Sequence, residues 1–407
     1  MESTLEIANA ALMPNYGPMG IEIISGKGTK VRTRDAEGRI KTCQDFLCGL
    51  GVTSVGHCHP EVVKAIEFQA NRFMHVSNLY ATSPMAKLAQ KLVQLSGDDK
   101  ASVFFCNDGT GANEAAAKLA RIWGHEKFGP KKKKIVALKQ GFHGRTWMSI
   151  TMTGQPKMQE KFAPNVPEVV FAELNNISDL RKMIDHDVCA VIFEVIQAEG
   201  GINRMNLEYY DELYNLSVEY DFLRIVDEVQ SGIGRTGFML AHDYFREEAG
   251  HQPEIITLAK ALGGGLPIGA VIARDGIGEY MLTGSHAATF GGNPVACAAG
   301  LAVLKVIEKQ DLLSRVSYLG DCMNVFLLSL AQRYPQKIKE VRGNGLIQGV
   351  ELYEGFSAGD VVKQMYQKGV LIGTAGPQVV RFLPPFIVTE EELNKALKKF
   401  ERIIKIL

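Results

Sequence analysis

Short apolar runs alternate with helix-like stretches through the middle of the chain. The apolar runs end at glycine or at charged residues, which is typical of strands buried on both faces. An alanine-rich helical stretch from 112 to 128 follows the first run. Strands of this kind separated by helices predict a mostly parallel sheet covered on both sides, with ligand sites beyond the carboxyl ends of the strands. The predicted strands lie at 103–106, 134–138, 188–196, 223–226 and 270–273.

The pattern changes in the last third of the chain. A long helical stretch from Asn293 to about Lys309 leads into short strand-like runs at 337–342, 349–352 and 379–382. A closing helix is predicted from Thr389, because three glutamates stand in its first turn and basic residues near its end, as the helix dipole favours. We therefore predict an α/β fold with a large sheet domain and a smaller α+β domain. The predicted boundaries are an N-terminal segment 1–47 that joins the small domain, a large domain 48–301 and a small domain 302–407.

Composition excludes several classes of function. Lysine plus arginine and aspartate plus glutamate number 45 each among 407 residues, so no net field favours nucleic acid or an anionic membrane. The run Lys131–Lys134 is interpreted as a solvated loop before a strand. The seven cysteines lack metal-ligand spacing and indicate free thiols in a reducing compartment, with no metal site. No apolar run is long enough to span a bilayer and no secretory signal is present, so we expect a cytoplasmic protein.

Lys260 stands in the most informative setting. Apolar residues flank it in Ile255–Leu262, and three glycines follow. Burial lowers the pKa of a lysine, and a neutral amine is what forms a Schiff base with a carbonyl cofactor such as pyridoxal phosphate. The alternative is a lysine whose stem packs on the core while its ammonium group stays in water.

A carboxylate at the end of a buried strand supports the first interpretation. Asp227 closes the run Arg224-Ile225-Val226-Asp227, and pyridoxal phosphate enzymes need an acid there to hold the pyridine nitrogen protonated. The alternative is an aspartate that caps a helix or a turn. Gly232–Gly237 formally matches the G-x-G-x-x-G dinucleotide fingerprint, but two acids separate it from the strand and no helix follows, so we reject that interpretation.

Two loops supply further candidate contacts. Asn107–Glu114 carries Gly109 and Thr110 between a strand and the alanine-rich helix, where amides at a helix N-terminus suit a phosphate; a simple N-cap is the alternative. In Gly141–Thr146, Phe142 can stack on a flat ring and Arg145 can bind a carboxylate, whereas His143 alone is more often structural.

Together these segments resemble the class III, fold-type I aminotransferases, especially the acetylornithine and ornithine aminotransferase branch. The resemblance covers nearly the whole chain and therefore implies a fold-type I transferase that depends on pyridoxal 5'-phosphate. The motifs that carry it, in chain order, are Asn15-Tyr16-Gly17-Pro18, Gly56-His57-Cys58-His59-Pro60, Phe142–Thr146, Asp227–Gln230, Thr257–Gly265, Thr289-Phe290-Gly291-Gly292-Asn293-Pro294 and Arg381–Pro385.

The resemblance implies roles around the cofactor. Lys260 matches the Schiff-base lysine, which also carries the proton in catalysis, and Asp227 matches the partner of the pyridine nitrogen. Thr289 matches a phosphate contact supplied by the neighbouring subunit, which implies a homodimer with shared active sites. The remaining cofactor contacts implied by the resemblance are Gly109, Thr110, Phe142 and Gln230.

The resemblance also implies a substrate site. Arg381 matches the arginine that binds the α-carboxylate of glutamate, and Glu199 matches the acid that pairs with it when an ω-amino substrate is bound instead. Arg145 and Tyr16 match positions that hold carboxylates. Leu50 stands where ornithine enzymes have a tyrosine and acetylornithine enzymes an aliphatic residue, so acylated donors are expected to outcompete free ornithine.

The chain departs from the family pattern at several positions. Asp108 replaces the serine or threonine of the usual phosphate loop, and Thr110-Gly111 replaces the Ala-Glu common in acetylornithine enzymes. Because an anion beside a phosphate is costly, we expect Asp108 to cap the helix. Glu194–Glu199 keeps both acids of its motif but loses the proline and the glycine. These departures favour a substrate of specialised metabolism over a housekeeping arginine pathway.

The function predicted first is transamination from an ω-amino, acetylornithine-like donor to 2-oxoglutarate through a pyridoxamine phosphate intermediate. An epimerase, aminomutase or decarboxylase with the same cofactor is the alternative, and a dinucleotide-linked oxidoreductase is a distant one. The retained Glu199 and Arg381 favour transamination, because that reaction alternates between two substrates. The expected partners are the amine donor, 2-oxoglutarate or glutamate and a second copy of the chain, with no nucleic acid or membrane.

Overall fold

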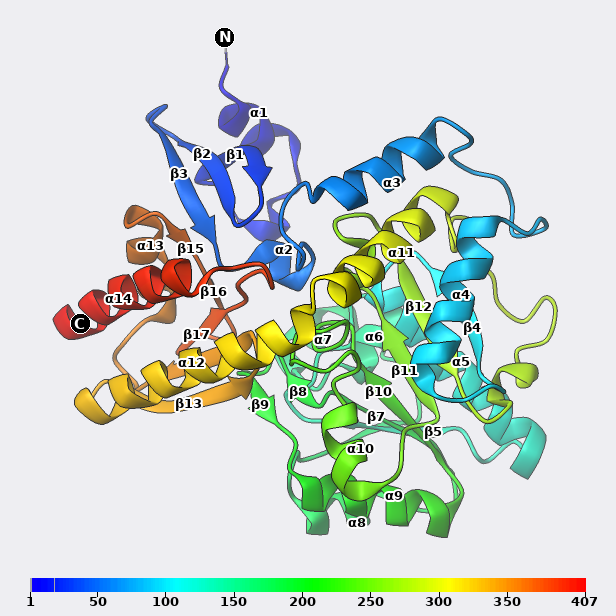
Figure 1. Cartoon of the computed structure of the whole chain (residues 1–407). Helices are drawn as coiled ribbons and strands as arrows, with labels where there is room; N and C mark the ends of the chain where they lie inside the picture. The colour runs from blue at the N-terminus through cyan, green and yellow to red at the C-terminus, as the bar shows by residue number, and fades with distance from the viewer. Residues whose placement is uncertain (1, 18) are drawn as a thin grey trace.

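The computed structural model describes residues 2–17 and 19–407. Figure 1 shows two lobes, one built on a large sheet and one that combines the two ends of the chain. Pro18, part of one family motif, lies outside the described residues. Within the described residues, no helix is both long and apolar enough to cross a membrane.

The large sheet has seven strands in the part of the chain that the structure describes, in the order β4-β12-β11-β10-β7-β5-β6. Strand β12 alone runs against its neighbours in this sheet, so the prediction of a mostly parallel sheet is confirmed. Every residue of β7, β10 and β12 is buried, as their unbroken apolar runs require. The bounds are β4 Ser102–Cys106, β5 Lys134–Leu138, β6 Val169–Ala172, β7 Val188–Phe193, β10 Leu223–Asp227, β11 Ile255–Leu258 and β12 Gly269–Ala273.

Helices cover both faces of this sheet. Successive strand residues point to opposite faces, so that Ile256 packs in the larger core cluster and Ile255 in the smaller one. The first face lies under α4 (Ser83–Ser96), α9 (Leu207–Tyr220) and α11 (Pro294–Lys309). The other face lies under α5 (Gly109–Phe128) and α6 (Trp147–Met152). Small alanines of α5 allow the close approach of this helix to the strands.

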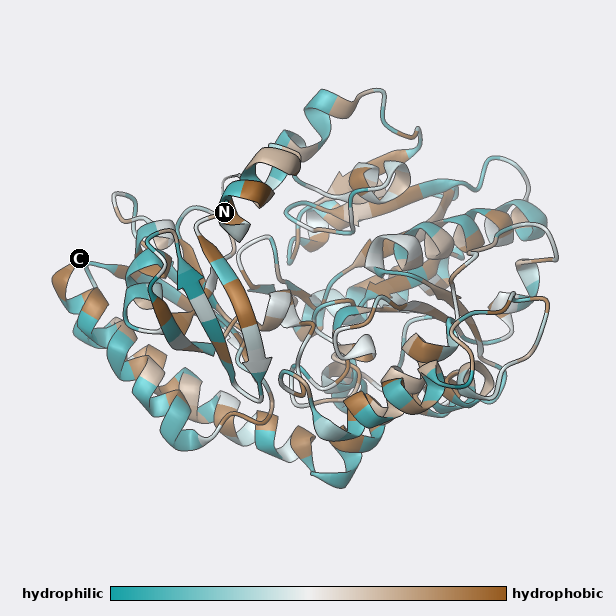
Figure 2. Cartoon of the chain, turned by 90° about the horizontal axis from the view of Figure 1, so that it is seen from above, coloured by the Kyte–Doolittle hydropathy of each residue, from teal (hydrophilic) through white to brown (hydrophobic). Residues whose placement is uncertain are grey.

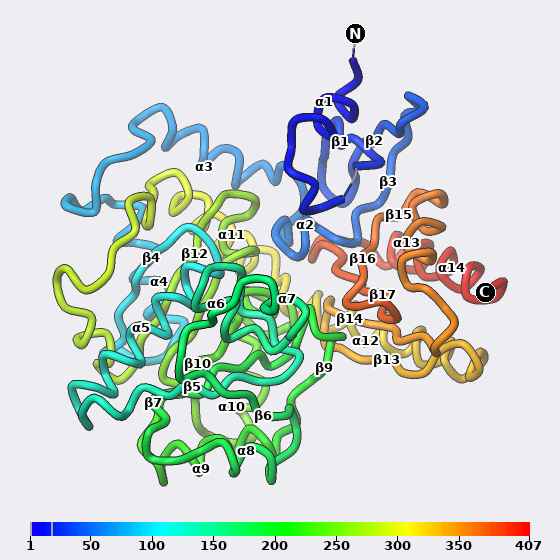
Figure 3. Tube along the Cα trace, turned by 180° about the vertical axis from the view of Figure 1, so that it is seen from behind, coloured from blue at the N-terminus to red at the C-terminus, as the bar shows by residue number. Residues whose placement is uncertain are grey.

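The second lobe combines the two ends of the chain. Its antiparallel sheet has the order β13-β14-β17-β16, and a separate sheet has the order β1-β2-β3-β15, in which β15 pairs with β3. Figures 1 and 3 both show the N-terminal strands beside the C-terminal elements. The strand bounds are β1 Ile21–Lys27, β2 Lys30–Asp35, β3 Ile40–Asp45, β13 Ile338–Asn344, β14 Ile347–Leu352, β15 Val370–Leu371, β16 Gly373–Thr374 and β17 Val379–Phe382.

The helices of this lobe include α1 (Thr4–Ala11), which packs against β1, and three from the C-terminal part: α12 (Leu312–Arg333), α13 (Ala358–Gln367) and α14 (Glu390–Ile406). The closing helix begins where the sequence predicts, with a capping box between Thr389 and Glu392. Its apolar stripe is buried and its other face is polar, which Figure 2 shows as alternating brown and teal bands. The domain boundaries at 47 and 301 stay predictions.

The prediction of a solvated lysine run is wrong at one position, whereas Lys131 and Lys133 are exposed as predicted. Lys132, in the lysine run interpreted as a solvated loop, is only 4% exposed. Its ammonium group donates to the carbonyls of His186 (3.2 Å) and Tyr220 (2.7 Å), and burial lowers its pKa. Composition could not reveal these carbonyls, because they belong to distant segments that the fold brings to the loop.

Candidate active site

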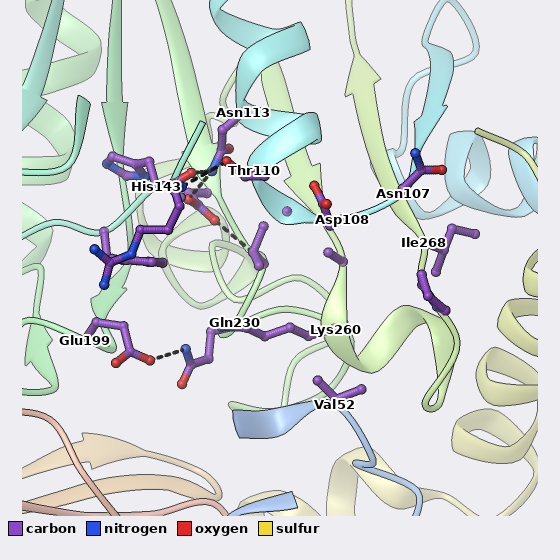
Figure 4. Close-up of a pocket in the computed structure, with 18 of the residues that line it drawn as sticks. Val52, Asn107, Asp108, Thr110, Asn113, His143, Glu199, Gln230, Lys260 and Ile268 are labelled. Carbon is purple, nitrogen blue, oxygen red and sulfur yellow. Dashed lines mark hydrogen bonds and ion pairs between the residues drawn. The ribbon is translucent and has the colours of Figure 1, made fainter. Parts of the chain in front are cut away.

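A cavity of about 450 Å³ opens at the carboxyl ends of the parallel strands (Figure 4). Its walls come from the segments that directly follow β4, β5, β7, β10 and β11, and from the segment that precedes β12. This is the edge where an open α/β sheet places its ligands. Asp108 lines this cavity, together with eight of the predicted site residues: Gly109, Thr110, Phe142, Arg145, Glu199, Asp227, Gln230 and Lys260.

Lys260 follows β11 after a single intervening residue and lines the cavity. Its backbone is left-handed, with φ of 41°, a conformation that strains any residue with a β-carbon. Burial lowers the pKa of its amine, and the nearby Arg381 cation lowers it further, while the acids Glu199, Asp227 and Glu194 oppose the shift. This shift has the direction that the predicted Schiff-base role requires.

Asp227 ends β10 and is almost fully buried. One carboxylate oxygen, Oδ2, accepts hydrogen bonds from Asn113 Nδ2 (2.7 Å) and His143 Nδ1 (2.8 Å). The other, Oδ1, accepts one from the amide of Val229 (3.0 Å). The alternative of an aspartate that only forms a turn therefore explains the hydrogen bond to Oδ1 but not those to Oδ2. The Asp227 side chain also lines the cavity.

The loop after β4 forms the start of α5. Asp108 caps this helix through a hydrogen bond of 2.7 Å from the amide of Gly111, as expected from the cost of an anion beside a phosphate. A β-carbon on Gly109 would lie 2.6 Å from Val229 Cγ1, so this wall admits only glycine. The Thr110 hydroxyl accepts from the amide of Arg145 (3.1 Å), which ties this loop to the one after β5. The first turn of α5 therefore provides a helix N-terminus suited to a phosphate.

Glu194, the first acid of its motif, is buried behind the loop after β5. It accepts hydrogen bonds from the amides of Phe142 (2.9 Å) and Ala198 (3.3 Å). Burial raises the pKa of Glu194 well above its ordinary value, and the negative charge of Asp227 raises it further. The carboxyl group is therefore shifted toward its neutral form, and it holds the Phe142 backbone at the cavity wall.

Glu199 and Arg381 form an ion pair of 2.6 Å at the edge of the cavity. Arg381, from β17 of the second lobe, is 2% exposed and also donates to Gln230 Oε1 (3.2 Å). Gln230 in turn donates to Glu199 (3.2 Å), as Figure 4 shows. Arg381, Glu199 and Gln230 therefore form one network. Burial alone would raise the pKa of Glu199, but the charge and hydrogen bond of Arg381 outweigh it and lower that pKa.

Four predicted residues do not line this cavity within the described chain: Tyr16, Leu50, Thr289 and Arg381, and Arg381 contacts the lining residues Glu199 and Gln230. Tyr16 is 88% exposed, Leu50 is 42% exposed, and Thr289 is exposed on the loop before α11. Their roles stay predictions. In the rejected dinucleotide motif, Arg235 is buried and donates to Ser54 Oγ (2.6 Å) and to the carbonyl of Leu346 (3.0 Å), which makes it a structural link between the lobes.

Sequence reasoning missed two residues that shape the site, Asn113 and Thr257, and gave no role to Glu194 beyond its motif. Asn113 lies four residues after Gly109 on the same helix, so helical spacing alone places both on one face. That spacing was a usable signal for Asn113. Thr257 lies within a buried strand and carried no comparable signal.

Comparison with known proteins decides the family. The family model for aminotransferase class-III matches residues 12–404. The chain belongs to the class-III aminotransferases. This class-III aminotransferase is 42% identical to the acetylornithine aminotransferase of Caldanaerobacter subterraneus, over 97% of each chain. It is 41% identical to that of Methanocaldococcus jannaschii, over 99% of this chain and 98% of the relative.

Solved structures agree with this assignment. The ornithine aminotransferase of Toxoplasma gondii ME49 superposes with a TM-score of 0.91 at 29% identity, over 100% of this chain and 99% of that one. The fold-type I prediction is therefore confirmed, as is the prediction of an aminotransferase. The cofactor of this class-III aminotransferase is pyridoxal phosphate. The cavity fits it: a glycine-walled helix N-terminus, a buried carboxylate and a lysine with a lowered pKa surround one space.

Proposed function

We propose that this aminotransferase moves an amino group from an ω-amino donor of the N-acetylornithine type to 2-oxoglutarate. The ion pair between Glu199 and Arg381 carries the proposal. Glutamate brings a carboxylate to Arg381, whereas an ω-amino donor presents a neutral or apolar chain there. An arginine left bare against the second substrate would be a buried unpaired charge, which is expensive. Glu199 neutralises it in one half-reaction and releases it in the other.

The remaining roles follow from the positions of the side chains. Bound pyridoxal phosphate supplies an aldehyde that takes up the amino group and a ring that withdraws electrons from the reacting carbon. Lys260 would hold the cofactor through its amine and would move the proton at the reacting carbon. Asp227 holds the ring nitrogen, Gly109 and Thr110 bind the phosphate, and Phe142 covers the ring. Gln230 donates to the ring hydroxyl, and Arg145, with Tyr16, binds substrate carboxylates.

The apolar side of the cavity supports an acylated donor. Val52, Leu266 and Ile268 line it, and Leu50 lies two residues before Val52. Aliphatic side chains offer no partner to the second ammonium group of free ornithine. We therefore propose that acylated or less polar donors are preferred. The departures at Asp108, Gly111 and Ala198 extend this proposal to a substrate of specialised metabolism.

We also propose a homodimer in which Thr289 reaches the phosphate site of the partner. The loop before α4 and the loop before α11 pack together through Asn78 Nδ2 and the carbonyl of Ala288 (3.0 Å), and His75 packs on Phe290 with ring centroids 5.1 Å apart. Apolar side chains on and around these loops are more than half exposed, namely Phe68, Met74, Leu79, Tyr80, Leu282 and Phe290. An apolar surface beside Thr289 supports burial against a second copy.

The two-domain division and a cytoplasmic location complete the proposal. The free cysteines, mostly buried, support a reducing compartment. The N-terminal strands support the division at 47, because β3 pairs with β15 of the second lobe.

The test follows the two half-reactions separately. Purified holoenzyme is mixed with N-acetylornithine, ornithine or other amines, and loss of the absorbance band of the bound cofactor is recorded. 2-Oxoglutarate is then added to restore the band. We expect N-acetylornithine to react faster than ornithine and 2-oxoglutarate to restore the band with one glutamate per site. Racemised or decarboxylated donor without glutamate would favour the epimerase or decarboxylase alternative instead.

A further inference from the structure

Asn113 connects the two ends of the cofactor site through one helix. It lies one turn beyond Gly109 and Thr110 on α5, is 1% exposed, and reaches Asp227 with an amide hydrogen bond of 2.7 Å. The helix that offers its N-terminus to the phosphate therefore also contacts the acid assigned to the ring nitrogen. Figure 4 shows Asn113 and Thr110 on this helix above the cavity, with Asp108 at its start.

The amide of Asn113 has a defined orientation. Its nitrogen donates to two acceptors, Asp227 Oδ2 and the carbonyl of His143 (2.8 Å). Its oxygen accepts from the hydroxyl of Thr257 (2.7 Å), a fully buried residue of β11. A flipped amide would turn its oxygen toward both acceptors, so only one orientation satisfies these buried groups.

This arrangement leaves one carboxylate oxygen of Asp227 for the cavity. Asn113 and His143 both donate to Oδ2, and Oδ1 receives only the amide of Val229 within the described residues. A carboxylate oxygen accepts more than one hydrogen bond, so Oδ1 keeps capacity toward a ring N–H. The donors on Oδ2 fix the rotation of the carboxylate about its last torsion.

We propose that Asn113 and Thr257 are positioning residues for the cofactor: Thr257 fixes the amide of Asn113, and Asn113 fixes the carboxylate of Asp227 toward the ring nitrogen. The proposal rests on the proposed role of Asp227. Because Asn113 lies one turn beyond Gly109 and Thr110 on α5, this helix sets the distance between the phosphate cradle and the ring-nitrogen acid. Neither Asn113 nor Thr257 lies in contact with the substrate-binding pair Glu199–Arg381.

Two variants of Thr257 test the pair. Thr257→Val keeps the shape and removes the hydroxyl, whereas Thr257→Ser keeps the hydroxyl. A matched control is Thr33→Val, which removes an equally buried hydroxyl in β2 of the other lobe. The measurements are the dissociation constant of pyridoxal phosphate for apoprotein, the pH dependence of the bound cofactor's absorbance, and thermal stability without cofactor.

Thr257→Val should weaken cofactor binding about tenfold, the upper end for one buried hydrogen bond, and shift the absorbance pH profile. Thr257→Ser should restore both, and Thr33→Val should lower thermal stability without changing either. The titratable groups around Asp227, namely His143, Glu194 and Lys260, are the same in every variant. The proposal would be overturned if Thr257→Val bound pyridoxal phosphate as tightly as wild type and kept its absorbance profile. It would also be overturned if Thr33→Val changed cofactor affinity and the absorbance profile as much as Thr257→Val.

Asn113→Asp provides an independent arm if Thr257→Val does not fold. It keeps the shape of the side chain but replaces the donor with a second carboxylate beside Asp227. The pH dependence of the cofactor absorbance should therefore shift by about one pH unit. An unchanged profile in this variant contradicts the positioning role. Asp227→Asn tests the proposed role of Asp227 separately from the roles of Asn113 and Thr257. If this variant leaves the absorbance profile unchanged, Asp227 does not hold the ring nitrogen, and the proposed roles of Asn113 and Thr257 fail for that reason.

Discussion

Replacement of Arg381 by alanine separates the two half-reactions. The guanidinium donates to Glu199 (2.6 Å), Gln230 (3.2 Å) and the carbonyl of Ala198 (3.1 Å), and it lies at the cavity edge where a substrate carboxylate would displace Glu199. In the glutamate half-reaction the variant loses the partner of that carboxylate. In the donor half-reaction Arg381 is already neutralised by Glu199, so its loss removes no contact to substrate charge.

The expected size follows from the hydrogen bonds that the arginine can make. A hydrogen bond to a charged group contributes about 1.5–3 kcal/mol, and a guanidinium can make two in parallel to one carboxylate. The glutamate half-reaction should therefore slow by about 3–6 kcal/mol, roughly a hundredfold to ten-thousandfold. The donor half-reaction should slow by about tenfold or less, the cost of rearranging Glu199 and Gln230.

Single-turnover absorbance measurements give both rates, with N-acetylornithine for one half and glutamate for the other. Glu199→Gln is the matched control, because it leaves Arg381 without its counter-charge and should slow the donor half-reaction more than the glutamate half. The proposal that Arg381 exchanges Glu199 for a substrate carboxylate would be refuted by either of two results. One is an equal loss of rate in both half-reactions of Arg381→Ala; the other is that Arg381→Ala and Glu199→Gln slow the same half-reaction more.

Three further predictions concern the acids and the subunit interface. Asp227→Asn should fold normally yet lose about tenfold to hundredfold in transamination rate, since an amide replaces a charge-assisted hydrogen bond; turnover near wild type speaks against its role. Glu194 has a raised pKa in the folded state, so apoprotein should lose stability as pH rises from about 4.5 toward that value, because only the unfolded chain then releases the proton. Glu194→Gln should lack this loss, and a melting-temperature difference between the two proteins that is constant with pH would contradict it. Mixing inactive Lys260→Ala with inactive Thr289→Asp should restore activity through hybrid dimers, whereas no recovery after confirmed subunit exchange would exclude shared sites.

Much of the fold could be predicted because buried strands and helix ends require particular residue types at nearby positions in the sequence. Strands such as β7 and β10 are buried on both faces, so their residues are apolar without interruption. The closing helix was predictable for a different reason, since Thr389 and the glutamates after it satisfy the amides of the first turn. Lys132 was mispredicted because its partners, the carbonyls of His186 and Tyr220, are distant in sequence.

The site was predictable only in part, because some of its contacts join residues that are distant in the sequence. Lys260, Asp227 and Gly109 each stand at the end of a strand or the start of a helix, and their motifs mark them. The network that orients Asp227 joins α5, the loop after β5 and β11, and only the fold brings Asn113, His143 and Thr257 together. Thr289 and Tyr16 are exposed in the single chain, so their roles stay proposals.

The most direct test of the central claim is to locate the lysine that carries the cofactor. Holoenzyme is reduced with borohydride, digested, and mapped by mass spectrometry for the peptide that retains the pyridoxyl group. The account predicts label on Lys260, in the peptide that spans β11 and the glycines after it, and no stable label in Lys260→Ala. Label on any other lysine in the wild-type protein would contradict the account.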